Sequence, residues 1–117
     1  MKAIIEVPKY VLTVLNQAFE IERRLSKLDD LTRFSRPLEK LKEAFDSDEA
    51  QFVIENPINQ KYEITRTDVE ATIAGTEHEG LIITEVLKPI IKWSSQGVSR
   101  IIQKGVVIAS TCKTPLQ

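Results

Sequence analysis

Residues 81–93 have the sequence LIITEVLKPIIKW, which is dominated by β-branched and other apolar residues. Turn formers bound this run, with Gly80 before it and the segment 94–97 after it, so it predicts β-structure. Proline lacks the backbone N–H that a sheet ladder uses. Pro89 therefore predicts either a bend in one long strand or the meeting point of two short strands.

Flanking segments extend the β prediction across the second half of the chain. The helical period is lost after Glu49, and turn formers recur at Asn56, Pro57 and Gly75. Apolar residues alternate with their neighbours along residues 69–73, as in a strand with one buried face. A last strand is predicted over residues 98–110, with Gly105 marking a bulge or kink. Residues 50–117 are therefore expected to form a small β domain.

The first half of the chain has the periodicity of helices. Between Pro8 and Leu28, apolar residues recur at alternating spacings of three and four, which predicts one helix. These residues are Val11, Val14, Ala18, Ile21, Leu25 and Leu28. A second stripe of Leu12, Leu15 and Phe19 widens the apolar arc, so this helix requires two neighbours. The neighbours are either other elements of the same chain or a second copy of it.

A shorter second helix is expected from Pro37 to Phe45. Asp29 and Asp30 interrupt the first pattern, Ser35 can cap a helix, and proline is tolerated in a first turn. The polar segment 46–49 then ends the helix. Residues 1–49 are thus predicted to form a helical dimerisation unit, and the fold class is α+β.

Composition narrows the function classes. The 117 residues suit one domain, or a helical unit with a small β unit, and the net charge of -1 offers no field for nucleic acid. No apolar run approaches the roughly 20 residues of a membrane span. The single cysteine, Cys112, indicates a reducing compartment. A soluble cytoplasmic protein without nucleic-acid or membrane partners is expected.

No group of residues has the composition of a catalytic site. His78 lies between Glu77 and Glu79, but no second ligand cluster or triad partner accompanies it. Cys112 lacks a nearby base, and the 4 glycines include no phosphate-binding loop. We therefore expect no enzyme activity, no metal and no cofactor, and a function in protein binding.

Three segments of the second half resemble, in order, the C-terminal β domain of GrpE, the nucleotide exchange factor of DnaK-type chaperones. Residues 67–74 (TDVEATIA) are similar to the family's short segment ending in Ala-Val or Ala-Ile. Residues 83–88 (ITEVLK) are similar to its Val-x-Glu-Val-Leu-Gln strand, and residues 97–110 to its final hairpin. Residues 10–20 (YVLTVLNQAFE) resemble a GrpE helix, so the resemblance covers nearly the whole chain.

The resemblance implies a fold, an oligomeric state and a partner. In GrpE the equivalent helices pair across a dimer into a four-helix bundle beside a β head. The implied homodimer interface comprises Val11, Val14, Leu15, Ala18, Ile21 and Leu25. The implied partner is the ATPase domain of a DnaK-type chaperone, from which the protein would promote ADP release in protein folding and the stress response. The resemblance points to Arg100, nearest to the family's contact arginine, as a partner-binding residue. Trp93 in the same region is a further candidate because large aromatic side chains are favoured at interfaces, and Gln103 and Lys104 complete the predicted partner-binding set.

Several departures from the GrpE pattern support a second hypothesis. We expect no long stalk helix ahead of the bundle. The segment 89–91 replaces the family's Gly-Tyr, and the segment 103–105 replaces its Arg-Pro-Ala step. The insertion of residues 92–96 is predicted to lengthen the hairpin turn. The alternative is a stand-alone homodimeric scaffolding protein that has lost chaperone binding.

Overall fold

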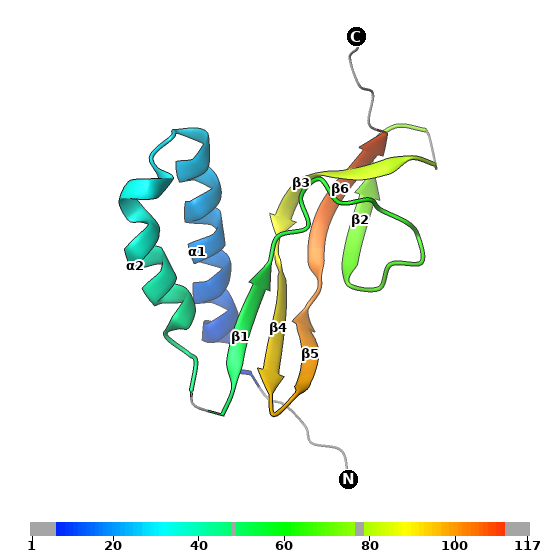
Figure 1. Ribbon diagram of the computed structural model, residues 1–117. Coiled ribbons are helices and arrows are strands. Elements are labelled where there is room, and N and C mark those ends of the chain that lie inside the picture. Colours follow the sequence, from blue (N-terminus) through cyan, green and yellow to red (C-terminus); the bar gives the residue numbers. More distant parts are fainter. Residues whose placement is uncertain (1–6, 48, 77–78, 112–117) are drawn as a thin grey trace.

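The computed structural model describes residues 7–47, 49–76 and 79–111, and these form an α+β fold. Two helices, α1 (Lys9–Lys27) and α2 (Leu31–Glu43), are followed by six strands. The strands are β1 (Gln51–Glu55), β2 (Val69–Ile73), β3 (Leu81–Lys88), β4 (Ile90–Ser95), β5 (Val98–Gln103) and β6 (Gly105–Thr111). The helices form a hairpin that lies beside one face of the strands (Figure 1).

Helix α1 confirms the helix that the apolar periodicity between Pro8 and Leu28 predicts. It ends at a turn in which Asp29 adopts a left-handed conformation with φ 64°. The N–H of Asp30 donates to the carbonyl of Leu25 at 3.0 Å, and the N–H of Asp29 donates to that of Ser26 at 3.3 Å. This bonding satisfies carbonyls that the helix end would leave free, and it turns the chain back into α2.

Helix α2 begins at Leu31, so the predicted start at Pro37 is wrong. Pro37 lies inside the helix, where its missing N–H removes one backbone hydrogen bond. The side chain of Pro37 is exposed, so water can reach the backbone at that point. The start depends instead on the turn at Asp29, which leaves Leu31 already in helical geometry.

The strands form two three-stranded sheets that share one long bent hairpin. The order β1-β4-β5 is antiparallel throughout, whereas in β2-β6-β3 strand β2 runs parallel to β6. Strand β3 continues into β4 across Pro89, and β5 continues into β6 across Lys104 (Figure 1). The prediction of two short strands meeting at Pro89 is therefore confirmed.

Gly105 is the first residue of β6 and lies beside the segment that contains Pro89. Its close contacts explain why the break between β5 and β6 lies at this point. A Cβ atom on Gly105 would lie 3.0 Å from Cγ1 of Ile90 and 3.2 Å from Cγ1 of Val69. A side chain at this position would therefore require Ile90 and Val69 to shift, and the predicted kink at Gly105 is confirmed, because β5 ends at Gln103 and β6 begins at Gly105.

The turn between β4 and β5 is shorter than the sequence suggested. Strand β4 continues through Ser95, and only Gln96 (φ 49°) and Gly97 (φ 79°) form the turn. Two successive residues with positive φ suit the right-handed twist of a hairpin. The expectation that residues 92–96 lengthen the turn is wrong, because residues 92–95 belong to strand β4.

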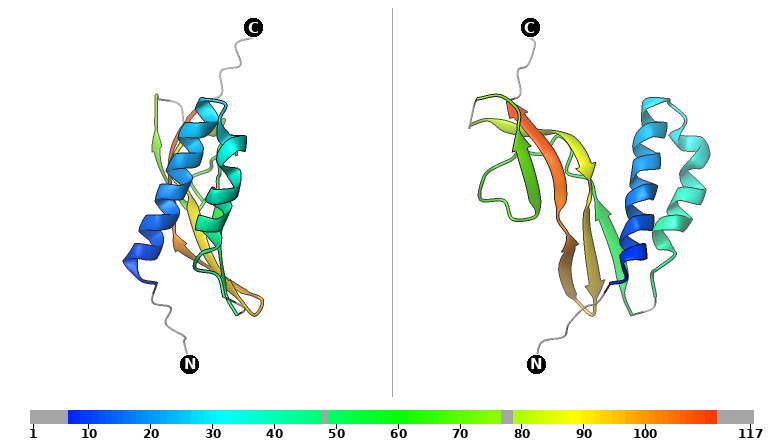
Figure 2. Two further views of the ribbon diagram at one scale, coloured as in Figure 1. Left: turned by 90° about the vertical axis from the view of Figure 1, so that its left-hand side faces the viewer. Right: turned by 180° about the vertical axis from the view of Figure 1, so that it is seen from behind.

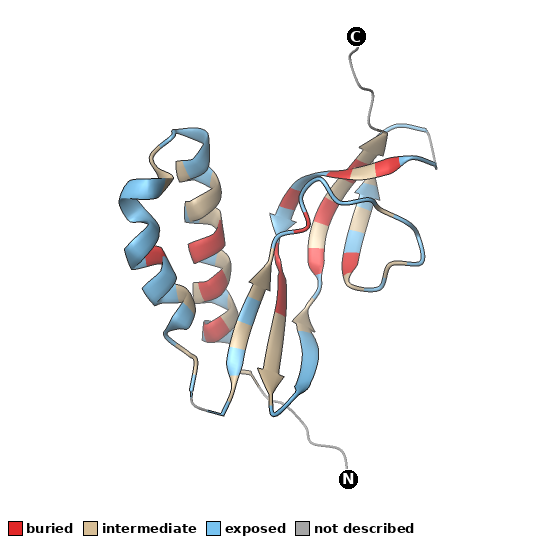
Figure 3. Ribbon diagram, viewed as in Figure 1, coloured by how far each residue is buried: buried red, intermediate tan, exposed pale blue. Residues whose placement is uncertain are grey.

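Two apolar clusters join the helices to the sheets. One contains Phe19 of α1 with Val69, Ile83, Val86, Ile90 and Val107. The other contains Val11 and Leu15 of α1 with Ile91 of β4. Ile54 packs against both clusters. The buried residues lie mainly along the side of α1 facing the strands and along the strands themselves (Figure 3).

Candidate interaction surfaces

The six residues predicted to form a dimer interface divide between the core and the surface. Val11, Leu15 and Ala18 are buried, Val14 and Leu25 are half-buried, and Ile21 is 43% exposed. The wide apolar arc of α1 has two neighbours within the chain, because one part packs on the sheet and the adjoining part on α2. Ile21 lies at the outer margin of this arc.

Large apolar side chains other than Ile21 are also exposed on the helical hairpin. Tyr10 and Leu28 are each nine residues from Phe19, or half a turn around α1 from the side that packs on the sheet. Phe34 and Leu41 lie seven residues apart on α2 and are 43% and 41% exposed. We call Tyr10, Ile21, Leu28, Phe34 and Leu41 the outer apolar face. The hairpin is seen from its outer side in Figure 2, left.

Trp93 and Arg100 lie together near the β4–β5 turn. They are directly opposite each other in the antiparallel register, which places both side chains on the same face of the sheet. Arg100 is exposed and makes no ion pair with any described residue, and Trp93 is half-buried. The structure therefore brings together two of the four residues predicted to bind a partner.

The other two predicted partner-binding residues have different environments. The amide of Gln103 accepts a hydrogen bond from Nδ2 of Asn16 and donates one to its Oδ1, both at 2.8 Å. Its Nε2 also donates to the carbonyl of Pro89 at 2.9 Å. Gln103 thus links α1 to the bend in the sheet, whereas Lys104 is exposed in the break between β5 and β6.

Arg66 organises the connection between β1 and β2, a role that the sequence analysis missed. Its guanidinium donates to both carboxylate oxygens of Asp68, at 2.7 and 3.0 Å, and to the carbonyl of Lys61 at 3.1 Å. These hydrogen bonds lower the pKa of Asp68 and raise that of Arg66, while partial burial opposes both shifts. The two-residue spacing between Arg66 and Asp68 was the one available signal, and such spacings are common on surfaces.

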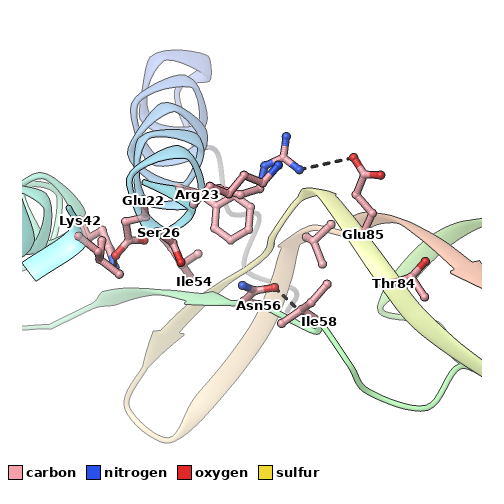
Figure 4. A pocket seen from close by; sticks show the side chains of 13 residues that line it. Glu22, Arg23, Ser26, Lys42, Ile54, Asn56, Ile58, Thr84 and Glu85 are labelled. Atoms are coloured by element: carbon pink, nitrogen blue, oxygen red, sulfur yellow. Dashed lines mark hydrogen bonds and ion pairs between the residues drawn. The ribbon is translucent and has the colours of Figure 1, made fainter. Parts of the chain in front are cut away.

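A cleft of about 660 Å³ opens between the helical hairpin and the sheets. Phe19, Ile54 and Val86 form its apolar floor. On one side Nζ of Lys42 lies 2.6 Å from Oε2 of Glu22, and on the other Nη1 of Arg23 lies 3.5 Å from Oε2 of Glu85 (Figure 4). This cleft has no signal in the sequence, because its walls come from segments far apart in the chain.

Arg23 is shared between two carboxylates at the mouth of this cleft. Its Nε donates to Oε1 of Glu20 at 3.2 Å, in addition to the longer contact with Glu85. The hydrogen bond that Arg23 donates to Glu20 is the main cause of the raised pKa of Arg23, and Arg24 and Arg23 together lower the pKa of Glu20. Arg23 therefore keeps its charge, and only the longer of its two carboxylate contacts spans the cleft.

Neither a metal-ligating cluster nor a membrane-spanning helix is found among the residues that the structure describes. Residues 7–47, 49–76 and 79–111 contain no cluster of three or more metal-ligating side chains. His78 and Cys112 lie outside these ranges. Among the same residues, no helix has the length and apolar character needed to span a bilayer.

Comparisons of the chain with family models, with curated proteins and with solved structures found no significant match. The candidate roles of the outer apolar face, the Trp93–Arg100 pair and the cleft therefore depend on the chain's own residues and geometry.

Proposed function

We propose that this protein is a homodimeric, GrpE-like co-chaperone that binds the ATPase domain of a DnaK-type chaperone and promotes ADP release. Such a protein needs no catalytic group. It binds the open state of the chaperone's nucleotide cleft more tightly than the closed, ADP-bound state, and this difference in affinity weakens ADP binding.

The observation that carries the proposal is the exposed Arg100 beside Trp93 near the tip of the β4–β5 hairpin. An arginine without an intramolecular carboxylate partner is available to an acidic group on another protein, and tryptophan and arginine are favoured at the energetic centres of interfaces. The sequence resemblance to the GrpE hairpin points to Arg100. Arg100 is accordingly assigned the chaperone contact.

Homodimerisation is assigned to the outer apolar face. The residues of this face are exposed large apolar side chains of the two-helix hairpin, and a second copy of the hairpin can cover them. Pairing about a two-fold axis would bring Ile21, Phe34 and Leu41 of each copy against the same face of the other. The interface is thus shifted outward from the buried residues Val11, Leu15 and Ala18.

The exchange activity is tested by the rate at which labelled ADP leaves a cognate DnaK-type chaperone. The wild-type protein is expected to accelerate release, and Arg100→Ala to reduce the acceleration at least about tenfold, as for the loss of one central charged contact. Arg36→Ala is the matched control, because Arg36 is an exposed arginine on α2. Wild-type protein that leaves the release rate unchanged would refute the proposal.

The dimer is tested by sedimentation of Ile21→Glu. A carboxylate introduced on the outer apolar face is expected to shift the protein toward monomer. Burying an unpaired charge in the interface is unfavourable by more than the apolar contact of Ile21 is favourable. Ile64→Glu is the control, since Ile64 is 85% exposed in the loop between β1 and β2. Equal sedimentation of the two variants would remove the assigned interface.

A stand-alone scaffolding function is the second candidate. The specific observation in its favour is that the amide of Gln103 is used within the chain and is not free for a partner. Under this alternative, the dimer persists but the chaperone is not bound. A dimeric wild-type protein that leaves ADP release unchanged would select it.

A further inference from the structure

The cleft lies where one edge of the sheet is left without a backbone partner. Residues 51–55 pair with β4, and the N–H of Ile83 in β3 donates to the carbonyl of Gln60 at 2.9 Å. Between these two ladders, within the described chain, no backbone hydrogen bond joins residues 56–58 to residues 84–88. Asn56 and Ile58 line one side of the resulting gap, and residues 84–86 line the other (Figure 4).

The mouth of the cleft carries one cation without an ion-pair partner among the described residues. Lys42 is closely paired with Glu22, and Arg23 is shared between Glu20 at 3.2 Å and Glu85 at 3.5 Å. Lys27 also lines the cleft and makes no ion pair with a described residue. Arg23 and Lys27 are four residues apart and therefore lie on the same side of α1. Lys27 is available to a negatively charged ligand, and the long contact of Arg23 with Glu85 is the one that such a ligand can replace.

We propose that this cleft binds a short, extended peptide segment of a partner protein in which an acidic residue adjoins an aliphatic residue. The peptide carboxylate pairs with Arg23 and Lys27 and replaces Glu85 as the partner of Arg23. The aliphatic side chain lies on the apolar floor of Phe19, Ile54 and Val86. The peptide backbone pairs with the open edge of β3, in the manner of strand addition.

Size and chemistry both favour this occupant. A volume of about 660 Å³ lies within the range of about 300–1,000 Å³ found for ligand sites, and it is too small for a folded domain. An uncharged apolar segment would leave Lys27 without an ion-pair partner. A free backbone edge is of use only to a ligand that has a backbone. The cleft is separate from Arg100 and Trp93, so the exchange proposal and this one can fail independently.

The test is an NMR titration of the ¹⁵N-labelled full chain with two acetylated and amidated pentapeptides, Gly-Leu-Glu-Leu-Gly and Gly-Leu-Gln-Leu-Gly. Saturable shifts are expected at the amides of Phe19, Ile54 and Val86. The glutamate peptide is expected to bind about tenfold more tightly, the difference that a charge-assisted hydrogen bond supplies.

Two substitutions in the cleft have opposite expected effects. Arg23→Gln removes the preference for the glutamate peptide, and Glu85→Gln tightens its binding several-fold, because the competing carboxylate is gone. Arg24→Gln is the control: Arg24 also pairs with Glu20, at 2.8 Å, but does not line the cleft. Unchanged preference is expected for this control.

Three results would overturn the proposal. The first is equal binding of the two peptides to the wild-type protein. The second is a set of shifts confined to the outer apolar face, which would indicate adsorption on the helices. The third is the lack of any saturable shift at millimolar peptide.

Discussion

Gln103 links α1 to the bend in the sheet, and its replacement by leucine is expected to lower the free energy of unfolding. The substitution removes three hydrogen bonds, two with Asn16 at 2.8 Å and one with the carbonyl of Pro89 at 2.9 Å. Each neutral hydrogen bond contributes about 1 kcal/mol, and an unsatisfied buried group costs about 1–3 kcal/mol. Because Asn16 and Gln103 are only partly buried, water recovers some of this loss. We expect Gln103→Leu to destabilise the protein by about 2 kcal/mol.

Urea denaturation followed by circular dichroism measures this change. A loss of about 2 kcal/mol lowers the urea midpoint by about 1 M at an ordinary m-value. The double variant Asn16→Leu with Gln103→Leu is expected to lose less than the sum of the single changes, by at least about 0.5 kcal/mol, because the two amides bond each other. Additive losses, or a stable Gln103→Leu variant that binds the chaperone more weakly, would refute the structural role and return Gln103 to the partner surface.

Three further predictions concern the core, the bend and the loop. Leu15→Ala, at a fully buried position against Ile91, is expected to cost about 2–5 kcal/mol in urea denaturation, and a smaller loss would mean that the helix is loosely packed. Gly105→Ala is expected to lower the free energy of unfolding by about 1–2 kcal/mol, because the added Cβ would lie 3.0 Å from Cγ1 of Ile90. A gain in stability would show that Ile90 moves freely. The hydrogen bond from Arg66 lowers the pKa of Asp68 in the folded protein. The ionised carboxylate therefore stabilises the fold fully above the ordinary pKa of 3.8, and this stabilisation is lost as pH falls through the lower pKa of the folded state. Asp68→Asn is therefore expected to flatten the acid decline of the urea midpoint, and parallel declines would contradict this.

Periodicity predicted the helix that packs on the sheet but not the neighbours of each residue. The spacing of apolar residues defines α1 within a residue at each end, because burial of one side of a helix requires that spacing. The same pattern cannot distinguish a residue that faces the chain's own sheet from one that faces a second copy. Leu15 and Ile21 belong to the same apolar arc, yet one is buried and the other is 43% exposed.

Local rules predicted the breaks in the strands better than the start of α2. Pro89 and Gly105 act through their own backbones, so their effects are visible in the sequence. Pro37 predicts a helix start, but α2 begins six residues earlier, at Leu31, after the turn at Asp29. A proline at an exposed helical position loses one hydrogen bond, and the next residue, Leu38, is buried.

Pairings between distant segments had no sequence signal. The parallel pairing of β2 with β6 joins residues more than thirty positions apart. The cleft also depends on tertiary structure, because it unites α1, α2 and two separate stretches of the β region, residues 54–58 and 84–86. A site made from paired charges such as Arg23 and Glu85 looks in the sequence like any solvated surface.

The bend in the sheet connects the proposed functions mechanically. Ile90 and Ile91 follow Pro89 directly and are fully buried against the residues of α1, and Gln103 holds Asn16 at the same level. The orientation of the β4–β5 hairpin relative to the helices is therefore set by packing at this bend and not by the distal turn. If two hairpins of helices pair through the outer apolar face, each bend fixes the direction in which its Arg100 projects. An adaptor that acts by preferring one shape of its partner needs this kind of rigidity, because a freely hinged Arg100 could follow the chaperone between its open and closed states and would favour neither.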